Sequence, residues 1–231
     1  SSAASDVYKR QMMIGATDMG TGCDTILSQM AADILETDLD NVIPFGVDTD
    51  IAPYDSGSYA SATTYITGKA VAKAAENLKE KVIKMGASML EVEPDEVTFN
   101  GKCVEKKDQS AKVTLPEIGV RGTFGNNDAL QVTENCGAEI SPPPYMVGIA
   151  EVEIDKETGS VELIDYVAVV DCGTPINPNL ARVQTEGGIA QGIGMALFED
   201  IQYTEKGAMA NNSLMPVSYT HLRAHETRGN L

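Results

Sequence analysis

The chain has 231 residues, and its 34 acidic against 17 basic side chains give a formal net charge of −17 at pH 7. A nucleic-acid partner is not expected, because a phosphate backbone is bound by clustered Lys and Arg. No membrane span is expected either, because no stretch approaches the roughly 20 apolar residues that one needs.

The two ends of the chain resemble translated sequencing adapters. Residues 1–11 match the in-frame translation of a transposase-type adapter, and the paired adapter read in the opposite sense accounts for residues 216–231. The alternative is a native Ser/Ala-rich start and a native basic tail. The adapter interpretation leaves 12–215 as the protein domain, and it removes both histidines, His221 and His225, from any chemical argument.

The first predicted elements are a strand over 12–18 and a helix that begins near Asp24, joined by the turn Gly20-Thr21-Gly22. Apolar residues recur at helical spacing after Asp24, and Asp24 or Thr25 is a candidate cap. A second strand follows over 41–47. The turn approaches a dinucleotide-binding fingerprint, but Thr25 stands where its last glycine belongs. No second parallel β-α unit is expected at the usual length, so a Rossmann fold is disfavoured. Two alternatives stay open for Gly20-Thr21-Gly22: a turn that binds an anion, or a tight turn without a ligand.

A loop rich in turn formers covers 48–61, and the longest predicted helix follows over 63–90. The small side chains and hydroxyls of Gly57-Ser58-Tyr59-Ala60-Ser61 can line a phosphate or pterin pocket. The alternative is an ordinary capping run, with Ser61 or Thr63 as the cap.

After residue 90 the chain is expected to contain two hairpins, a strand end with a helix start between them, and a final helix. The first hairpin covers 96–104 and turns at Asn100-Gly101, and a strand end and helix start are expected over 114–118. After a loop-rich segment over 121–144, alternating apolar residues predict a hairpin that joins 145–154 to 160–170. Long helices beside antiparallel hairpins indicate an α+β fold.

The last predicted helix covers 179–200 and is rich in glycine. Each glycine in a helix costs on the order of 1 kcal/mol relative to alanine, and close packing against another backbone or a large ligand would explain that cost. Gln184 and Gln191 lie seven residues apart and share a face. The preceding turn, from Asp171 to Pro178, is expected to be structural, with Asn177 as a candidate cap.

Most other chemistry is excluded by composition. A Ser-His-Asp or Cys-His arrangement needs a native histidine, and the Asp48 and Asp50 carboxylates are better explained by the general acidity than by a glycosidase-like pair. The four cysteines form no C-x-x-C pair, so reduced, mostly buried thiols in a cytoplasmic protein are expected rather than a zinc or iron–sulfur site.

Taken in order and at their spacing, three loops resemble the second cofactor-binding domain of the xanthine dehydrogenase and aldehyde oxidase family. They are Asp18-Met19-Gly20-Thr21-Gly22, Gly57-Ser58-Tyr59-Ala60-Ser61 and Gln184-Thr185-Glu186-Gly187-Gly188. The resemblance covers residues 12–215 and includes Asp48-Thr49-Asp50 and the Asp171-to-Pro178 turn. The chain is therefore expected to be an internal fragment of a molybdopterin-binding large subunit.

The resemblance implies which residues hold the cofactor. The family's first loop usually reads Gly-Gln-Gly, and Thr21 replaces that glutamine here, as in some bacterial purine-type members. The molybdenum is held by the pterin dithiolene, so no metal-ligating side chain is implied. The implied cofactor-binding residues are Met19, Gly20, Thr21, Gly22, Ser58, Ala60, Ser61, Thr63, Thr64 and Gln184.

The resemblance also implies a reaction and partners. Members of the family hydroxylate an electron-poor carbon of a small-molecule substrate with water as the oxygen source, and electrons leave through iron–sulfur and FAD domains or subunits. The implied cofactor is molybdenum–molybdopterin, in its cytosine dinucleotide form. The catalytic glutamate lies further toward the C-terminus than this chain reaches, so no residue here is assigned to catalysis.

The sequence is compatible with three functions. The first is oxidation of a purine or related N-heterocycle, and the second is an aldehyde oxidoreductase of the same family. The third is a non-catalytic structural or interaction domain in which the glycine loops are only turns. Convergence of residues 19–22, 58–64 and 184 on one cleft would favour a cofactor site.

Overall fold

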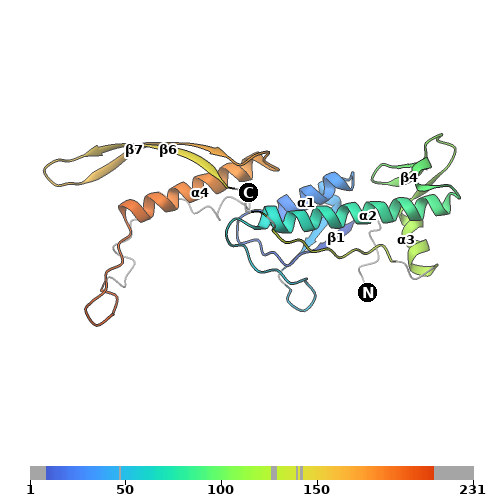
Figure 1. The fold of residues 1–231 in the computed structure, drawn as a ribbon, viewed down its shortest axis with the longest axis horizontal. Helices are drawn as coiled ribbons and strands as arrows, with labels where there is room; N and C mark the ends of the chain where they lie inside the picture. The colour runs from blue at the N-terminus through green and yellow to red at the C-terminus, as the bar shows by residue number, and fades with distance from the viewer. Residues whose placement is uncertain (1–8, 47, 126–128, 139, 141–142, 211–231) are drawn as a thin grey trace. The chain divides into compact units, whose positions relative to one another are not determined.

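The computed structural model describes residues 9–46, 48–125, 129–138, 140 and 143–210. The chain divides into two compact units (Figure 1). Unit 1 comprises Ser1–Asp18 and Cys23–Glu139, and unit 2 comprises Met19–Gly22 and Ile140–Leu231. Most of both predicted adapter tails, and both histidines, lie outside the described residues.

Unit 1 opens with a parallel β-α-β unit, which the sequence did not lead us to expect. β1 (Arg10–Met13) pairs in parallel with β2 (Val42–Phe45), and α1 (Cys23–Ile34) and the short 3-10 helix η1 (Leu39–Asn41) lie between them. Parallel neighbours need a crossover connection, which α1 supplies. The sequence did not predict this parallel pairing, because a short apolar run carries no information on strand direction. The α+β class is confirmed, since the described parallel sheet has only these two strands.

Arg10 ties β1 to the rest of unit 1. Its guanidinium donates to the Thr37 hydroxyl at 3.0 Å and to the Gly101 carbonyl at 2.6 Å. The adapter interpretation places Arg10 and Gln11 in the N-terminal tail, and in the structure both are residues of β1.

The start of α1 is capped from a distance. The helix begins at Cys23, so Asp24 and Thr25 lie inside it and the expectation that either caps it was wrong. The backbone N–H of Asp24 instead donates to the Asp18 carboxylate at 3.2 Å. Burial raises the pKa of Asp24, and the neighbouring Asp18 charge adds to the effect. The apolar face of α1, with Leu27 fully buried, packs on the parallel strands and on Val71 of the long helix.

The predicted long helix is confirmed, with an irregular first turn. A π-helical turn, η2 (Thr63–Thr67), leads into α2 (Gly68–Met89). Neither Ser61 nor Thr63 is the cap, because Ala62 occupies that position and no side chain caps the turn. Single π turns occur often at functional sites.

The far end of α2 packs on a small antiparallel sheet. A 3-10 turn, η3 (Pro94–Glu96), leads into β3 (Val97–Phe99), which pairs with β4 (Cys103–Lys106), and β4 pairs with β5 (Lys112–Thr114). The predicted Asn100-Gly101 turn is confirmed, and the Asn100 side chain accepts from the backbone of Cys103 at 3.0 Å. α3 (Leu115–Phe124) follows behind a Thr114–Glu117 capping box.

Gly86 allows α2 to approach β4, and we expect Gly86→Ala to destabilise unit 1. An added Cβ would lie 2.6 Å from Cβ of Val104, whose side chain is 0% exposed. Overpacking of this kind costs about 1–3 kcal/mol. Gly119→Ala in α3 is the matched control: nothing lies within 4 Å of its added Cβ, so it should stabilise by about 1 kcal/mol. Urea unfolding of both variants measures the difference, and equal stabilities would contradict this packing.

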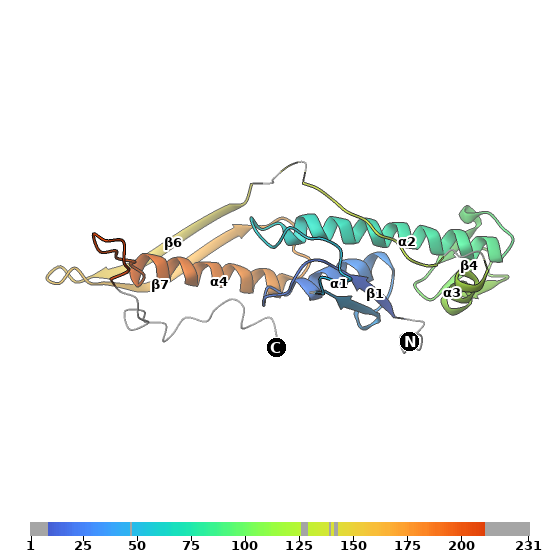
Figure 2. The same ribbon diagram turned by 90° about the horizontal axis from the view of Figure 1, so that it is seen from below.

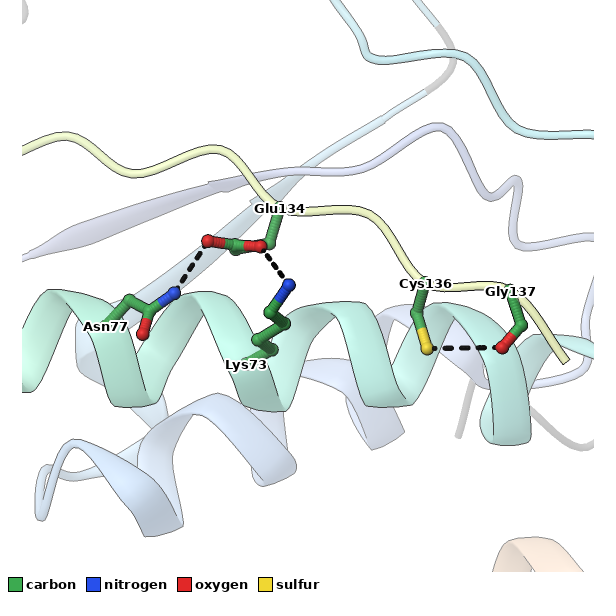
Figure 3. Close-up of polar contacts among 5 residues, drawn as sticks. All are labelled: Lys73, Asn77, Glu134, Cys136 and Gly137. Carbon is green, nitrogen blue, oxygen red and sulfur yellow. Dashed lines mark hydrogen bonds and ion pairs between the residues drawn. The ribbon is translucent and has the colours of Figure 1, made fainter. Parts of the chain in front are cut away.

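An extended segment over residues 129–138 lies along α2 (Figure 3). Leu130, Val132, Glu134 and Cys136 are partly buried while the residues between them are exposed, so every second side chain faces inward. The Glu134 carboxylate accepts from Asn77 at 2.6 Å and pairs with Lys73 at 2.7 Å. Lys81 donates to the Ala129 carbonyl at 2.7 Å.

The Glu134 contacts predict an acid-sensitive attachment. The hydrogen bond from Lys73, and then that from Asn77, lowers the pKa of Glu134. A lowered folded-state pKa means that the contribution to stability is present above the unfolded pKa, near 4.3, and is lost as pH falls through the folded value. We expect Lys73→Met to raise the pKa of Glu134 in an NMR carboxyl titration. Lys69→Met, one turn away, should leave it unchanged, and an equal effect of the two variants would refute the assignment.

Unit 2 contains a long hairpin and a helix. β6 (Tyr145–Ile154) pairs antiparallel with β7 (Val161–Asp171), as predicted, and α4 (Pro178–Leu197) follows (Figure 2). Asn177 caps α4 by accepting from the backbone of Leu180 at 3.1 Å. Among the described residues, no helix is long and apolar enough to cross a membrane.

Candidate cofactor-binding site

The first candidate loop, Met19–Gly22, is built by two glycines with left-handed backbone. Gly20 has φ 101° and Gly22 has φ 76°, a region that residues with a side chain rarely adopt. Gly22 is buried, while Met19 is 55% exposed. The loop therefore turns tightly at its end and leaves its first residue accessible.

Unit 2 holds this loop against the first turn of α4. A Cβ added to Gly22 would lie 2.8 Å from one methyl of Leu180 and 2.9 Å from the other. Gln184 is one helical turn after Leu180, and its side chain is exposed. Two of the three sequence-predicted elements are thus brought together within one unit.

The second candidate loop, in unit 1, has an unusual backbone. Gly57 has φ 107°, and the consecutive residues Ala60 and Ser61 have φ 51° and 58°. Left-handed backbone at residues other than glycine costs on the order of 1–3 kcal/mol and clusters at ligand sites. The sequence predicted a loop of small and hydroxyl side chains here, but it did not predict this left-handed backbone.

Asp55 organises this loop, although sequence reasoning did not single it out. Its carboxylate accepts from the backbone of Gly57 at 2.8 Å and from the Thr67 hydroxyl at 3.0 Å. Within the loop, the Thr63 hydroxyl donates to that of Ser58 at 2.8 Å. Ser58, Ala60, Ser61 and Thr64 are exposed, and Thr63 is half-buried.

Gly15 fixes the position of the Asp55 segment beside the end of β1. A Cβ added at Gly15 would overlap the Pro53 carbonyl oxygen and lie 2.6 Å from Cβ of Asp55. An isolated glycine inside a strand pattern indicates close backbone approach, so this contact had a signal in the sequence. Gly15, which precedes the first candidate loop, therefore packs against Pro53 and Asp55, which precede the second candidate loop.

The two loops suit an anionic ligand. The second loop offers the exposed hydroxyl groups of Ser58, Ser61 and Thr64, and left-handed turns such as those at Gly20, Gly22 and Gly57 are common in anion-binding concavities. The second loop belongs to unit 1, and the first loop and Gln184 belong to unit 2. Convergence of all three elements on one cleft stays a prediction.

The glycines of α4 are not all explained by packing within the chain. Gly187 and Gly194 are buried, whereas nothing lies within 4 Å of a Cβ added at Gly188 or Gly192. Tight packing within the described chain therefore accounts for only part of the glycine content. Gly188 and Gly192 are one turn apart and form a smooth strip on the exposed side of the helix.

The cysteines and acidic groups give little support for a metal held by side chains. Cys23 and Cys103 are buried, Cys136 is intermediate and Cys172 is exposed, so the expectation of mostly buried thiols holds for two of the four. Asp18, Cys23 and Asp24 are the one group among the described residues whose ligand atoms lie within 4.8 Å of one another. Asp18 already accepts from the start of α1, which gives the group a structural role.

Comparison with known proteins identifies the family of this chain. The family model described as molybdopterin cofactor-binding domain matches residues 9–226. The probable hypoxanthine oxidase XdhD of Escherichia coli (strain K12) is 36% identical over 196 residues, which is 84% of this chain and 20% of that protein. The 6-hydroxypseudooxynicotine dehydrogenase complex subunit gamma of Paenarthrobacter nicotinovorans is 30% identical, over 87% of this chain and 26% of that protein.

Two solved structures are also similar to this chain in fold. Quinoline 2-oxidoreductase from Pseudomonas putida 86 matches with a TM-score of 0.74 at 27% identity, over 92% of this chain and 28% of that chain. Cu,Mo-CO dehydrogenase matches with a TM-score of 0.72 at 28% identity, over 89% of this chain and 26% of that chain. The chain thus spans only about a fifth to a quarter of the relatives it matches. It belongs to the molybdopterin cofactor-binding domain family and is part of a molybdopterin-binding large subunit of the xanthine dehydrogenase type.

Proposed function

We propose that the full-length protein hydroxylates a purine or a related N-heterocycle, with water as the oxygen source, and that this chain forms part of its cofactor pocket. The similarity to a probable hypoxanthine oxidase supports the purine class. The similarity to nicotine 6-hydroxylase, at 31% identity, supports a wider range of N-heterocycles. An aldehyde oxidoreductase is the second candidate, and family membership weighs against a non-catalytic scaffold.

The residues present fit the proposed cofactor. The left-handed backbone at Gly20 and Gly22 forms a tight turn that residues with a side chain rarely adopt, and Ser58, Ser61 and Thr64 offer exposed hydroxyl groups. We assign Met19–Gly22, Ser58, Ala60, Ser61, Thr63 and Thr64 to the pterin and its phosphates, and Gln184 to the same group from α4. When bound, the cofactor supplies the two-electron redox chemistry, and the role of this chain is to bind and orient it.

The cofactor's form and its electron partners are part of the same proposal. We propose the cytosine dinucleotide form of molybdopterin, with iron–sulfur and FAD domains or subunits as electron acceptors, in the cytoplasm. Relatives named as subunits of dehydrogenase complexes support separate partner subunits. The remainder of the large subunit supplies the catalytic glutamate and the substrate pocket.

The observation that carries the proposal is the contact of Gly22 with Leu180, one turn before Gln184. It supports the assignment, because residue 22 of the proposed cofactor loop packs against the helix that carries Gln184. Gln184 follows Leu180 by one helical turn and is exposed.

Gln184→Ala in the full-length protein tests this assignment. We expect a several-fold loss of molybdenum and pterin per protein, because one hydrogen-bond partner of the cofactor is removed and each such bond contributes about 1 kcal/mol. Gln191→Ala is the matched control, on the same face of α4 but about 10 Å further along. Metal analysis and pterin fluorescence give the loading, and a larger loss for Gln191→Ala would overturn the assignment.

A further inference from the structure

The β6–β7 ribbon carries two chemically different regions on one face. Residues directly opposite each other in an antiparallel pair share a face, as do residues two apart on one strand. The register therefore places an aliphatic patch at one end of this face and an acidic ladder at the other. The aliphatic patch consists of Val147, Ile149, Val167 and Val169 and is bordered by the opposed pair Tyr145 and Asp171, and the acidic ladder consists of Glu151, Glu153, Glu162 and Asp165.

The aliphatic patch is the most exposed apolar region of the ribbon. Its side chains are 53–67% exposed, against 38–56% for the exposed large apolar side chains of the opposite face, which are Met146, Val152, Ile154, Val161 and Val170. Contiguous exposed apolar surface marks an interaction site in soluble proteins. An isolated two-stranded hairpin is marginally stable in water, so this face needs a cover.

The described part of unit 2 does not supply that cover. Among the described residues, every buried large apolar side chain lies in unit 1. The ribbon also has no third strand among the described elements. Residues outside the described elements of unit 2 must therefore cover the aliphatic patch.

A second copy of the chain is disfavoured by charge. Two copies that meet symmetrically through this face bring the same patch on each into contact. The acidic ladders would then border the same interface, on chains that each carry a net charge of −17. Like-charge juxtaposition across an interface opposes association.

The remaining polypeptide of the large subunit is the better occupant. Solved relatives contain this domain within a chain nearly four times as long, since the match spans 26–28% of them. We infer that large-subunit residues outside these 231 cover the aliphatic patch, and that the acidic ladder stays in solvent. The boundary falls between Ile149 and Glu151 on β6 and between Val167 and Asp165 on β7.

Cysteine labelling in the full-length protein tests the boundary. Val147→Cys reports on the patch and Glu153→Cys on the ladder, six residues apart on one strand and on the same face. Cys136 and Cys172 are replaced by Ser in both, because they are the accessible native thiols in this chain. Maleimide labelling rates are normalised to those of the urea-unfolded variants.

We expect Val147→Cys to react at least tenfold more slowly than Glu153→Cys in the full-length protein. Equal rates at the two positions, fast or slow, would overturn the inference. Protection of Val147→Cys in the isolated 231-residue chain that disappears on dilution would assign the patch to a second copy instead. Hydrogen exchange of the unmodified full-length protein gives the same comparison without substitution, with slower exchange at 145–149 than at 151–165 expected.

Discussion

Gly22→Val is expected to reduce the molybdenum content of the full-length protein by at least tenfold. The φ of 76° at Gly22 is unfavourable for any side chain and most of all for a β-branched one. The strain is on the order of 1–3 kcal/mol, and each 1.4 kcal/mol is about a tenfold change in an equilibrium. The new methyl groups would also overlap Leu180 and push the loop away from α4.

Gly159→Val separates backbone strain from loss of the loop contact. Gly159 has the same φ of 76° and lies in the β6–β7 turn, where nothing is within 4 Å of an added Cβ. Metal analysis should find its molybdenum content unchanged. Leu180→Ala added to Gly22→Ala should recover part of the loading by relieving the overlap. Equal losses in the Gly22 and Gly159 variants would show that cofactor binding does not depend on the contact with α4.

The isolated 231-residue chain is expected to show no hydroxylase activity. We expect this chain to lack the catalytic base, and general acid–base catalysis contributes about 10²–10⁴-fold. We expect the larger loss to come from an incomplete cofactor pocket, because the chain spans about a quarter of its relatives.

Chromatographic assay of hypoxanthine oxidation with an artificial electron acceptor measures this difference. The full-length protein, assayed in the same way, is the positive control. Turnover by the isolated chain above the buffer background would show that these residues contain a complete active site, and the assignment of the base to a later segment would then be wrong.

Much of the secondary structure could be predicted because its signals are local. Residues close together in the sequence produce each of these signals: the Asn100-Gly101 turn, the apolar alternation in β6 and β7, and the helical spacing of apolar residues in α1 and α2. The parallel pairing of β1 with β2 was missed because strand direction depends on a crossover rather than on either strand's pattern. The cap of α1 was missed for a related reason, since Asp18 reaches it across a loop.

The candidate site was predictable in composition but not in conformation. The glycines of the first loop, and the small residues of the second, were visible in the sequence. The left-handed φ at Ala60 and Ser61, and the organising role of Asp55, were not, because no local rule assigns such a backbone to Ala or Ser. Likewise, the Glu134 contacts with Lys73 and Asn77 join residues 57 or more positions apart, which no periodicity reports.

A structure of the full-length protein with its cofactor bound tests the central claim most directly. We expect residues 19–22, residues 58–64 and Gln184 all to lie within hydrogen-bond or van der Waals distance of the pterin or its phosphates. A cofactor that contacts none of these three elements, with Gly22 still packed against Leu180, would show that the loops are only turns and would contradict the assignment.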